Sequence, residues 1–361
     1  MGYFKNINLI NFRNFDNLKF EFSKKCNVLY GKNGSGKTNI LEAISLFSKG
    51  RGIRNDQLSN LIKKNYDKFI IKSDFENKQI KYKLITESRE VNFRQRKIIK
   101  INNDDSKEFL NNFYKLILFL TFVPETERLF TSSPSNRRNF IDRLIFTHQI
   151  EYNKLINKYN KSLLERSKII KNKSYDNNWL DKIEKNISNF GIQIYLLRQN
   201  QIDSLIRYLN LYIKDFNLSF LIRAQLNDKF YFNKLDENFF AQELKNNRDI
   251  DALYGSSKIG PHKSDYIFYI DKDYPVSQLS TGQQKTIILL IFLSQCQYLL
   301  EHFEQKPILL LDEICSHLDQ LNREIMLNLI EKFNLQVFMT GTSKKLFSFL
   351  STKTNFCNIT I

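Results

Sequence analysis

Apolar and polar positions alternate with a period of two along much of the first hundred residues. The alternating or apolar runs are short, and turns separate them. Such runs are typical of β-strands, because successive side chains of a strand point to opposite faces of its sheet. The pattern predicts six strands, at residues 7–12, 18–22, 27–30, 69–75, 80–86 and 97–101.

The period changes at Ser133, beyond which apolar residues recur mostly at intervals of three, four or seven. Ser133 and Pro134 suit the N-cap and the first position of a helix. A second helical stretch follows residues 175–178, with one apolar stripe formed by Ile183, Ile187, Phe190, Ile194 and Leu197. We therefore expect a helical hairpin with arms of roughly 40 residues, each about 60 Å long if straight.

Strand and turn character returns in the last third of the chain. We expect strands and turns within 260–275, an apolar helix at 286–300, a helix at 322–332, and buried strands at 307–311 and 336–340. The pattern thus predicts an α/β fold. Residues 1–125 and 255–361 would form a split head, and residues 126–254 a helical insertion domain.

The charge of the chain is segregated. The formal net charge is +17, and the first 173 residues carry +18 while the remaining 188 carry −1. Such segregation indicates a polyanion as a partner. A lysine-rich solvated face would give the same count, so charge alone leaves both interpretations open.

Several classes of protein are disfavoured by composition. The four cysteines form no CxxC pair and the four histidines are scattered, so neither a disulfide framework nor a zinc site is expected. The N-terminus is polar rather than signal-like, and the longest apolar run, residues 287–293, is far shorter than a membrane span. We expect a cytoplasmic protein with no membrane partner.

The sharpest motif is GxxxxGK[ST], which directly follows the predicted strand at 27–30 and precedes a helical stretch. In such a loop, backbone N–H groups surround phosphates and the helix dipole adds positive potential. Lys37 would reach the terminal phosphates, and Thr38 would offer a hydroxyl to Mg²⁺. The predicted ATP-binding residues of this loop are Gly31, Lys32, Asn33, Gly34, Ser35, Gly36, Lys37 and Thr38.

Two further segments indicate an ATP site when they occur together with this loop. Residues 308–313 (ILLLDE) are an apolar strand ending in two carboxylates. Asp312 would hold Mg²⁺, while Glu313 would orient and deprotonate the attacking water. Residues 279–285 (LSTGQQK) open the apolar helix. Ser280 alone would more often be a helix cap.

In this order, the three elements resemble the ABC-type ATPases, in which the signature loop of one subunit closes over the nucleotide of another. That resemblance implies that Ser280, Gly282 and Gln283 contact ATP across a dimer. The loop at 316–319 (SHLD) is similar to the loop that this superfamily places at its dimer interface.

Three more segments narrow the resemblance to the RecF family of bacterial recombination-mediator ATPases. They are residues 11–15 (NFRNF), residues 124–125 with 133–142 (PE and SPSNRRNFID), and residues 260–265 (GPHKSD). The resemblance covers nearly the whole chain. It implies an ATP-dependent homodimer that binds gapped or junction DNA and helps load recombinase with recombination mediator proteins.

Other functions are weaker alternatives. A transporter ATPase has a much shorter stretch between phosphate loop and signature. A GTPase motif at 233–236 (NKLD) stands in the wrong order, and 271–273 (DKD) is more consistent with a hairpin turn than with a nuclease site. A structural DNA clamp with little ATP turnover, similar to SMC proteins, remains the main alternative.

The basic block at 126–173 gives the candidate DNA contacts Arg137, Arg138, Arg143, Lys154 and Lys158. For Arg137 and Arg138, ion pairs with Asp142 or Glu127 are an alternative. ATP hydrolysis should be slow. Transport ATPases keep a histidine after the strand equivalent to 336–339, whereas residues 340–342 (TGT) stand there in this chain.

Overall fold

The structure is a computed structural model and describes residues 2–92, 94–171, 176–228, 236–271, 273–315 and 318–360. Contacts divide the chain into a head, residues 1–127 and 281–361, and an insertion, residues 128–280. The sequence pattern places residues 255–280 in the head, and the structure corrects this boundary. Strand β10 (Asp265–Ile270) pairs antiparallel with β9 (Ile222–Asn227), so this segment completes a sheet of the insertion.

An antiparallel sheet forms one layer of the head, in the order β3-β2-β5-β6-β7 with β1 paired to β5. Its strands are β1 (Gly2–Phe4), β2 (Asn6–Phe12), β3 (Phe15–Glu21), β5 (Ile70–Asn77), β6 (Ile80–Val91) and β7 (Arg94–Ile101). Five of the six strands predicted in the first hundred residues are thereby confirmed. The sixth belongs to the second sheet.

That second sheet is parallel, in the order β14-β4-β13-β12-β8. Its strands are β4 (Cys26–Tyr30), β8 (Phe119–Phe122), β12 (Ile308–Leu311), β13 (Val337–Gly341) and β14 (Asn355–Asn358). The order places β13 between the strand before the phosphate loop and the strand that ends in carboxylates. Parallel strands align their carboxyl ends at one edge, where ligands bind in open α/β sheets.

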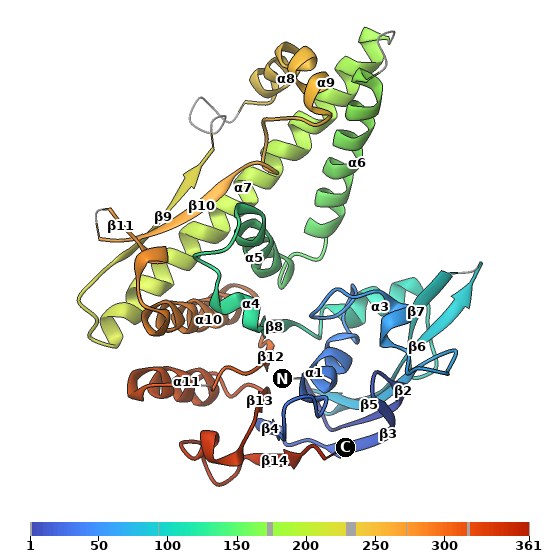
Figure 1. Cartoon of the computed structure of the whole chain (residues 1–361), viewed down its shortest axis with the longest axis vertical. Helices are drawn as coiled ribbons and strands as arrows, with labels where there is room; N and C mark the ends of the chain where they lie inside the picture. The colour runs from blue at the N-terminus through green and yellow to red at the C-terminus, as the bar shows by residue number, and fades with distance from the viewer. Residues whose placement is uncertain are drawn as a thin grey trace. The chain divides into compact units, whose positions relative to one another are not determined.

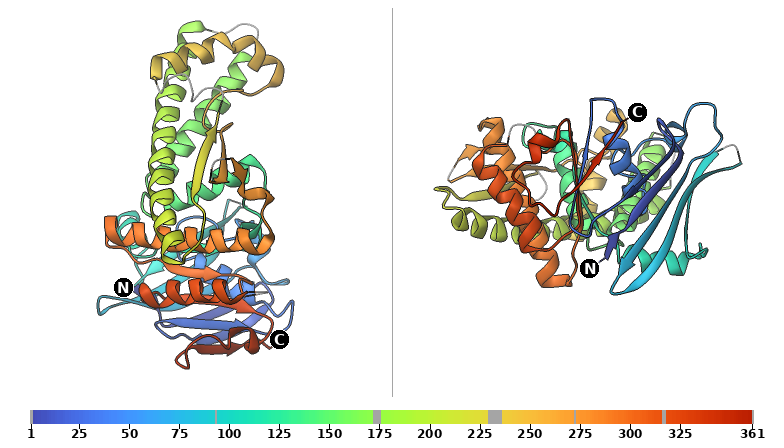
Figure 2. Two further views of the ribbon diagram at one scale, coloured as in Figure 1. Left: turned by 90° about the vertical axis from the view of Figure 1, so that its left-hand side faces the viewer. Right: turned by 90° about the horizontal axis from the view of Figure 1, so that it is seen from below.

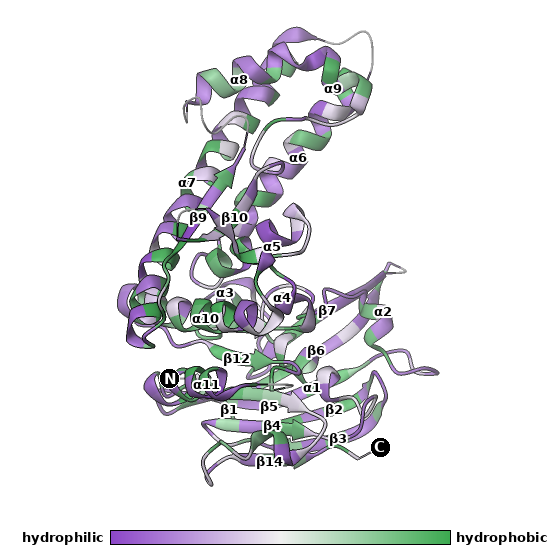
Figure 3. Ribbon diagram, turned by 60° about the vertical axis from the view of Figure 1, so that its left-hand side comes forward, coloured by the Kyte–Doolittle hydropathy of each residue, from purple (hydrophilic) through white to green (hydrophobic). Residues whose placement is uncertain are grey.

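Helices complete the head beside its two sheets (Figure 2). They are α1 (Lys37–Ser45), α2 (Leu58–Leu61), α3 (Lys107–Tyr114), α4 (Pro124–Glu127), α10 (Thr281–Phe303) and α11 (Gln320–Lys332), with a 3₁₀ turn at Lys344–Phe347. Apolar residues dominate the middle turns of α10 (Figure 3). It is long and apolar enough to cross a membrane on length and composition alone, but 67% of its most apolar window is buried inside the protein. This burial is typical of a core helix.

The core of the head is rich in phenylalanine and is bounded by both sheets and α1. One buried amide ties the two sheets together. The Gln336 side chain accepts a hydrogen bond from the Phe4 backbone N–H (2.8 Å) and donates to the Phe4 carbonyl (2.7 Å). Gln336 precedes β13 and Phe4 ends β1, so the antiparallel sheet is fixed to the strand at the centre of the parallel one.

The insertion is built on the predicted helical hairpin, which is confirmed (Figure 1). Its elements are α5 (Pro134–Phe146), α6 (Tyr152–Ile170), α7 (Asn177–Asp215), α8 (Glu237–Asn246), α9 (Arg248–Tyr254), β9, β10, β11 (Tyr274–Pro275) and a 3₁₀ turn at Val276–Gln278. Ser133 caps α5 as expected, accepting from the Asn136 N–H, with Pro134 at the first helical position. The first arm of the hairpin is shorter than expected because the helix is interrupted between α5 and α6.

A buried ion network joins α6, α7 and α9 within the insertion. Arg166 Nε lies 2.8 Å from Glu184 Oε1, and Arg166 Nη1 lies 2.6 Å from Asp251 Oδ2. Each of these three side chains is at most 2% exposed. Arg248 adds further hydrogen bonds to Glu184 and Asp181. Buried charges of this kind are costly to leave unpaired, so the network fixes which helices pack together.

Candidate nucleotide site

The phosphate loop connects β4 to α1 through a tight backbone turn. Gly34 and Gly36 have φ angles of 82° and 89°, in the left-handed region where glycine is favoured. A Cβ added at Gly36 would lie 2.5 Å from the Phe15 ring, and one at Gly31 would lie 2.4 Å from the Ile359 carbonyl oxygen. Close packing therefore requires glycine at both Gly31 and Gly36, and at Gly36 the backbone conformation favours it as well.

Two side chains of the loop face its interior. The Lys37 ammonium donates to the carbonyls of Gly31 and Lys32, both at 2.9 Å, so it bridges the loop from within. The Ser35 hydroxyl is buried and has no hydrogen-bond partner among the described residues. A buried hydroxyl without a partner is costly, and a bound phosphate oxygen would satisfy it. The loop thus fits a nucleotide phosphate.

A compact group of oxygen atoms lies at the carboxyl ends of β12 and β13. Asp312 Oδ1 accepts hydrogen bonds from the Thr38 hydroxyl (3.0 Å) and the Thr340 hydroxyl (2.6 Å). Asp312 itself is 3% exposed. The structure thus brings Thr38 and Asp312 together, although 274 positions separate them in the sequence. A carboxylate beside a threonine hydroxyl offers the oxygen ligands that Mg²⁺ prefers.

Glu313 is exposed, next to this group, and its backbone is held in an unusual conformation. Its φ angle is 53°, uncommon for a residue other than glycine. The Glu313 backbone N–H donates to the Thr340 hydroxyl at 2.8 Å. Thr340 therefore joins Asp312 to the backbone of Glu313. Sequence reasoning missed this role, and the only available signal was a threonine at the end of an apolar strand.

A second group of side chains supports the loop from behind. Arg13 Nε and Nη2 each donate to the Glu42 carboxylate at 2.9 Å, and Nη2 also donates to Asp56 at 2.9 Å. Glu42 lies on α1 and is fully buried. Asn14 accepts a hydrogen bond from Asn39, also on α1, at 2.8 Å. Residues 11–15, which the sequence marks only by family resemblance, thus anchor the helix that carries Lys37 and Thr38.

The signature residues lie where the sequence passes from the insertion to the head. Thr281, Gly282 and Gln283 are exposed on the first turn of α10, and Ser280 is the last residue of the insertion. Within the head, Lys285 Nζ of α10 pairs with Glu127 of α4 at 2.7 Å. In the loop after β12, Asp319 caps α11 by accepting from the Asn322 N–H. Ser316 and His317 of the expected interface loop lie outside the described residues.

The candidate DNA residues separate into two groups. Arg137 makes a two-pronged contact with Asp265, from Nε at 2.7 Å and from Nη2 at 2.8 Å, and its Nη1 donates to the Phe130 and Ser132 carbonyls. Arg138 donates to the Ser264 carbonyl. Both therefore hold the start of β10, which argues against their use as phosphate contacts. The expected ion-pair partners, Asp142 or Glu127, are also not the ones observed.

The other three candidates are exposed on helices of the insertion. Arg143 lies on α5. Lys154 on α6 forms a surface ion pair with Glu151 at 2.6 Å, and the Lys158 ammonium lies 5.9 Å from the centroid of the Phe190 ring. Surface pairs of this kind contribute little stability and open readily to another anion. These side chains are compatible with contacts to phosphates.

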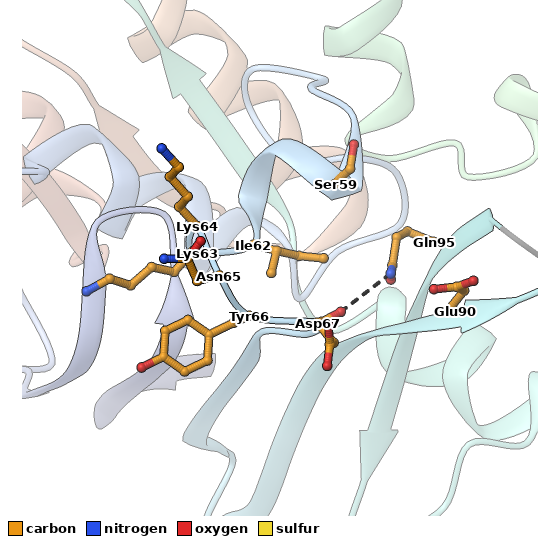
Figure 4. Close-up of a pocket in the computed structure, with 9 residues that line it drawn as sticks. All are labelled: Ser59, Ile62, Lys63, Lys64, Asn65, Tyr66, Asp67, Glu90 and Gln95. Atoms are coloured by element: carbon orange, nitrogen blue, oxygen red, sulfur yellow. Dashed lines mark hydrogen bonds between the residues drawn. The ribbon is translucent and has the colours of Figure 1, made fainter.

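The cysteines are part of the protein core. All four are free and buried, and burial raises the pKa of Cys26 to about 12. Across the described ranges, no group of three or more His, Cys, Asp or Glu side chains could hold a metal ion. A hollow of about 330 Å³ in the head lies between residues 59–67 and the β6–β7 hairpin (Figure 4). It shares no residue with the phosphate loop.

The phosphate loop, the acidic strand beside it and the helix opened by LSTGQQK place this chain in the class of ABC-type P-loop ATPase heads. The family model "RecF/RecN/SMC N terminal domain" matches residues 3–357. A "DNA replication and repair protein RecF" of Rickettsia bellii is 33% identical over 338 residues, covering 93% of each chain. The chain belongs to the RecF family.

Solved structures agree with this assignment. The "recombination mediator protein RecF-ATPrS in RecFOR pathway" matches with a TM-score of 0.83 and 28% identity, over 97% of this chain and 94% of the other. An Smc head domain from Pyrococcus furiosus matches with a TM-score of 0.53 and 17% identity, over 97% and 92% of the two chains, which supports the fold alone.

Proposed function

We propose that this protein is an ATP-dependent DNA-binding protein of recombinational DNA repair and replication restart. The observation that carries the proposal is the contact of Thr38 and Thr340 with Asp312 at the edge of the parallel sheet, which supports a nucleotide site there. The printed names of the relatives, DNA replication and repair proteins, support the biological role. A cytoplasmic location follows from that role.

In this proposal the loop residues 31–38 bind the ATP phosphates through backbone N–H groups, and Lys37 turns its ammonium from the loop carbonyls to the terminal phosphates. Thr38 and Asp312 would hold Mg²⁺, which when bound neutralises charge on the phosphates. Glu313 orients the attacking water and accepts its proton. The solved structures of relatives named with ATP and ATPrS support the choice of nucleotide.

The proposed active form is a homodimer assembled on ATP. Ser280, Gly282 and Gln283 are exposed. Residues that contact the nucleotide bound to a second copy must be exposed before the dimer assembles. Glu313→Gln should keep ATP binding, stop turnover and accumulate the dimer, whereas Lys37→Ala should abolish ATP binding. Size-exclusion chromatography with ATP tests this, and a monomeric Glu313→Gln protein that binds ATP would contradict the role given to the signature residues.

Hydrolysis in this proposal is slow, which suits a switch that dwells on DNA. Thr340 stands near the place of the transporters' histidine, and its hydroxyl is already engaged by Asp312 and Glu313. One group fewer is then available to position water against the terminal phosphate. A kcat near the usual enzyme value of roughly 10 s⁻¹ would contradict this part of the proposal.

The DNA partner is supported by the basic first half of the chain and by the exposed side chains of Arg143, Lys154 and Lys158. We expect a preference for gapped or junction DNA, and cooperation with recombination mediator proteins to load recombinase. Anisotropy titrations against single-stranded, duplex and gapped DNA, with and without ATP, test the DNA preference. An SMC-like clamp with little turnover is the alternative, and DNA-stimulated ATP hydrolysis would exclude it.

A further inference from the structure

We infer that the outer face of the β6–β7 hairpin in the head binds the phosphate backbone of DNA, an inference that rests on the proposed DNA-binding function. The hairpin is the pair of strands labelled β6 and β7 in Figure 1. The four outer-face cations nearest the hairpin turn, Arg89, Arg94, Arg96 and Lys100, are defined here as the hairpin cations; Lys81 and Lys83 lie on the same face farther from the turn.

The strand register places the hairpin cations on one face. Arg89 lies directly opposite Arg96, Val91 opposite Arg94, and Ile85 opposite Lys100. Residues directly opposite each other in an antiparallel pair share a face, as do residues two apart along one strand. The alternation therefore gathers all four cations on the same side of the sheet.

Away from the turn, the other face of the hairpin is packed in the core, which leaves the cationic face outward. Leu84, Ile99 and Ile101 on the inner face are between 0% and 3% exposed. Arg89, Arg94 and Arg96 are all exposed. The three arginines lie nearer the turn, where Glu90 and Gln95 of the inner face line the hollow described above, and the strand pairing fixes their spacing.

The acidic residues on this face do not neutralise it. Glu87 is shared, lying 2.9 Å from Arg89 Nη2 and 3.3 Å from Lys100 Nζ. Across the described ranges, no acidic side chain lies within ion-pair distance of Arg94 or Arg96. The directly opposed Arg89 and Arg96 repel each other, which works against the hairpin. An arrangement that costs stability in the free protein fits a surface that an anion covers.

The chemistry of the face favours DNA over an acidic protein. The arginine guanidinium binds two phosphate oxygens at once. Cations two residues apart on a strand repeat about every 6.8 Å, a spacing that suits the regular charges of a phosphate backbone. Protein interfaces instead need an apolar centre. None of the exposed large apolar side chains of the described residues belongs to residues 84–101.

The test compares two charge reversals of equal size. The variant Arg94→Glu/Arg96→Glu removes two hairpin cations, and Lys24→Glu/Lys25→Glu changes two exposed lysines of the β3–β4 turn as a control. Each protein is titrated against a fluorescent gapped duplex from 50 to 300 mM salt. Binding of a fluorescent ATP analogue and thermal unfolding are measured in parallel.

We expect the hairpin variant to bind DNA at least about tenfold more weakly at 100 mM salt, for all sequences alike. The slope of log K against log salt should flatten by about 1.8, or 0.9 for each lost phosphate contact. The control should keep the wild-type slope, and ATP binding should be unchanged in both. Arg96→Gln relieves the repulsion from Arg89, so it should unfold at no lower temperature while flattening the slope by about 0.9.

Two results overturn the inference and can be told apart. If the wild-type protein binds DNA and the hairpin variant shows the same slope of log K against log salt, this face does not bind DNA, but the proposed function stands. Wild-type protein that binds no DNA at any salt overturns the inference together with the proposed function.

Discussion

Thr340→Val tests the central contact of the nucleotide site with an almost isosteric change. The Thr340 hydroxyl donates to Asp312 at 2.6 Å and accepts from the Glu313 N–H at 2.8 Å. Valine keeps the shape and the β-propensity at the end of β13 but removes both hydrogen bonds. Asp312 retains the Thr38 hydroxyl at 3.0 Å, so its carboxylate keeps one of its two donors.

The expected loss of stability follows from these two bonds. A hydrogen bond to a charged group contributes about 1.5 to 3 kcal/mol, and leaving the part-buried Glu313 N–H unsatisfied costs about 1 to 2 kcal/mol, the lower part of the usual range. We therefore expect the free energy of unfolding of the head to fall by about 2 to 5 kcal/mol. For a unit of this size, 3 kcal/mol lowers the melting temperature by about 6 to 12 °C.

Turnover should fall more than ATP binding. Glu313 loses the bond that fixes its left-handed backbone, so its carboxylate should be misplaced relative to the attacking water. We expect kcat to drop about 10- to 100-fold, equivalent to about 1.4 to 2.7 kcal/mol, while the Kd for ATP changes less than about threefold. Hydrogen exchange of the Glu313 amide should accelerate, and Thr340→Ser, which keeps the hydroxyl, should restore all three properties in large part.

Thr342→Val is the matched control, because Thr342 is exposed two residues further along the chain. Its effect on stability should be within about 0.5 kcal/mol. Should Thr340→Val and Thr342→Val prove indistinguishable in melting temperature, amide exchange and turnover, the coupling of Asp312 to Glu313 through Thr340 would be refuted.

Three further predictions concern charge. Glu313→Gln should elute as an ATP-dependent dimer in size-exclusion chromatography, and a monomer at saturating ATP would count against the shared site. Burial lowers the pKa of Lys97 from 10.5 to about 7. Between about pH 7 and 10 the unfolded chain therefore binds more protons than the folded protein, so the free energy of unfolding should rise with pH. Urea unfolding of Lys97→Met should lack this rise, and a pH profile identical to that of the wild type would contradict the role of Lys97. Arg166→Met leaves Asp251 buried without a cation and Glu184 with Arg248 alone, which should destabilise the insertion by about 3 to 5 kcal/mol. Amide exchange at α6 and α9 should accelerate, and unchanged exchange would argue against the network.

Local patterns in the sequence determined the elements and the phosphate loop. The alternation in the first hundred residues predicts strands because side-chain direction within a strand depends only on neighbouring residues. The loop at 31–38 is predictable for the same reason, since glycine conformation, the helix start and the Lys37 side chain are all properties of one short segment. The apolar strand ending at Asp312 was also evident, although its proximity to Thr38 was not.

Contacts between distant segments were decided only by the tertiary structure. Thr340 lies in the site because the sheet order places β13 between β4 and β12. The hydrophobic pattern of a single strand does not determine that order. Arg137 is held by Asp265, 128 positions away, rather than by a neighbour in sequence. Residues 255–280 belong to the insertion because β10 pairs with β9. In each case one residue type suits several partners, and only packing of the whole chain selects among them.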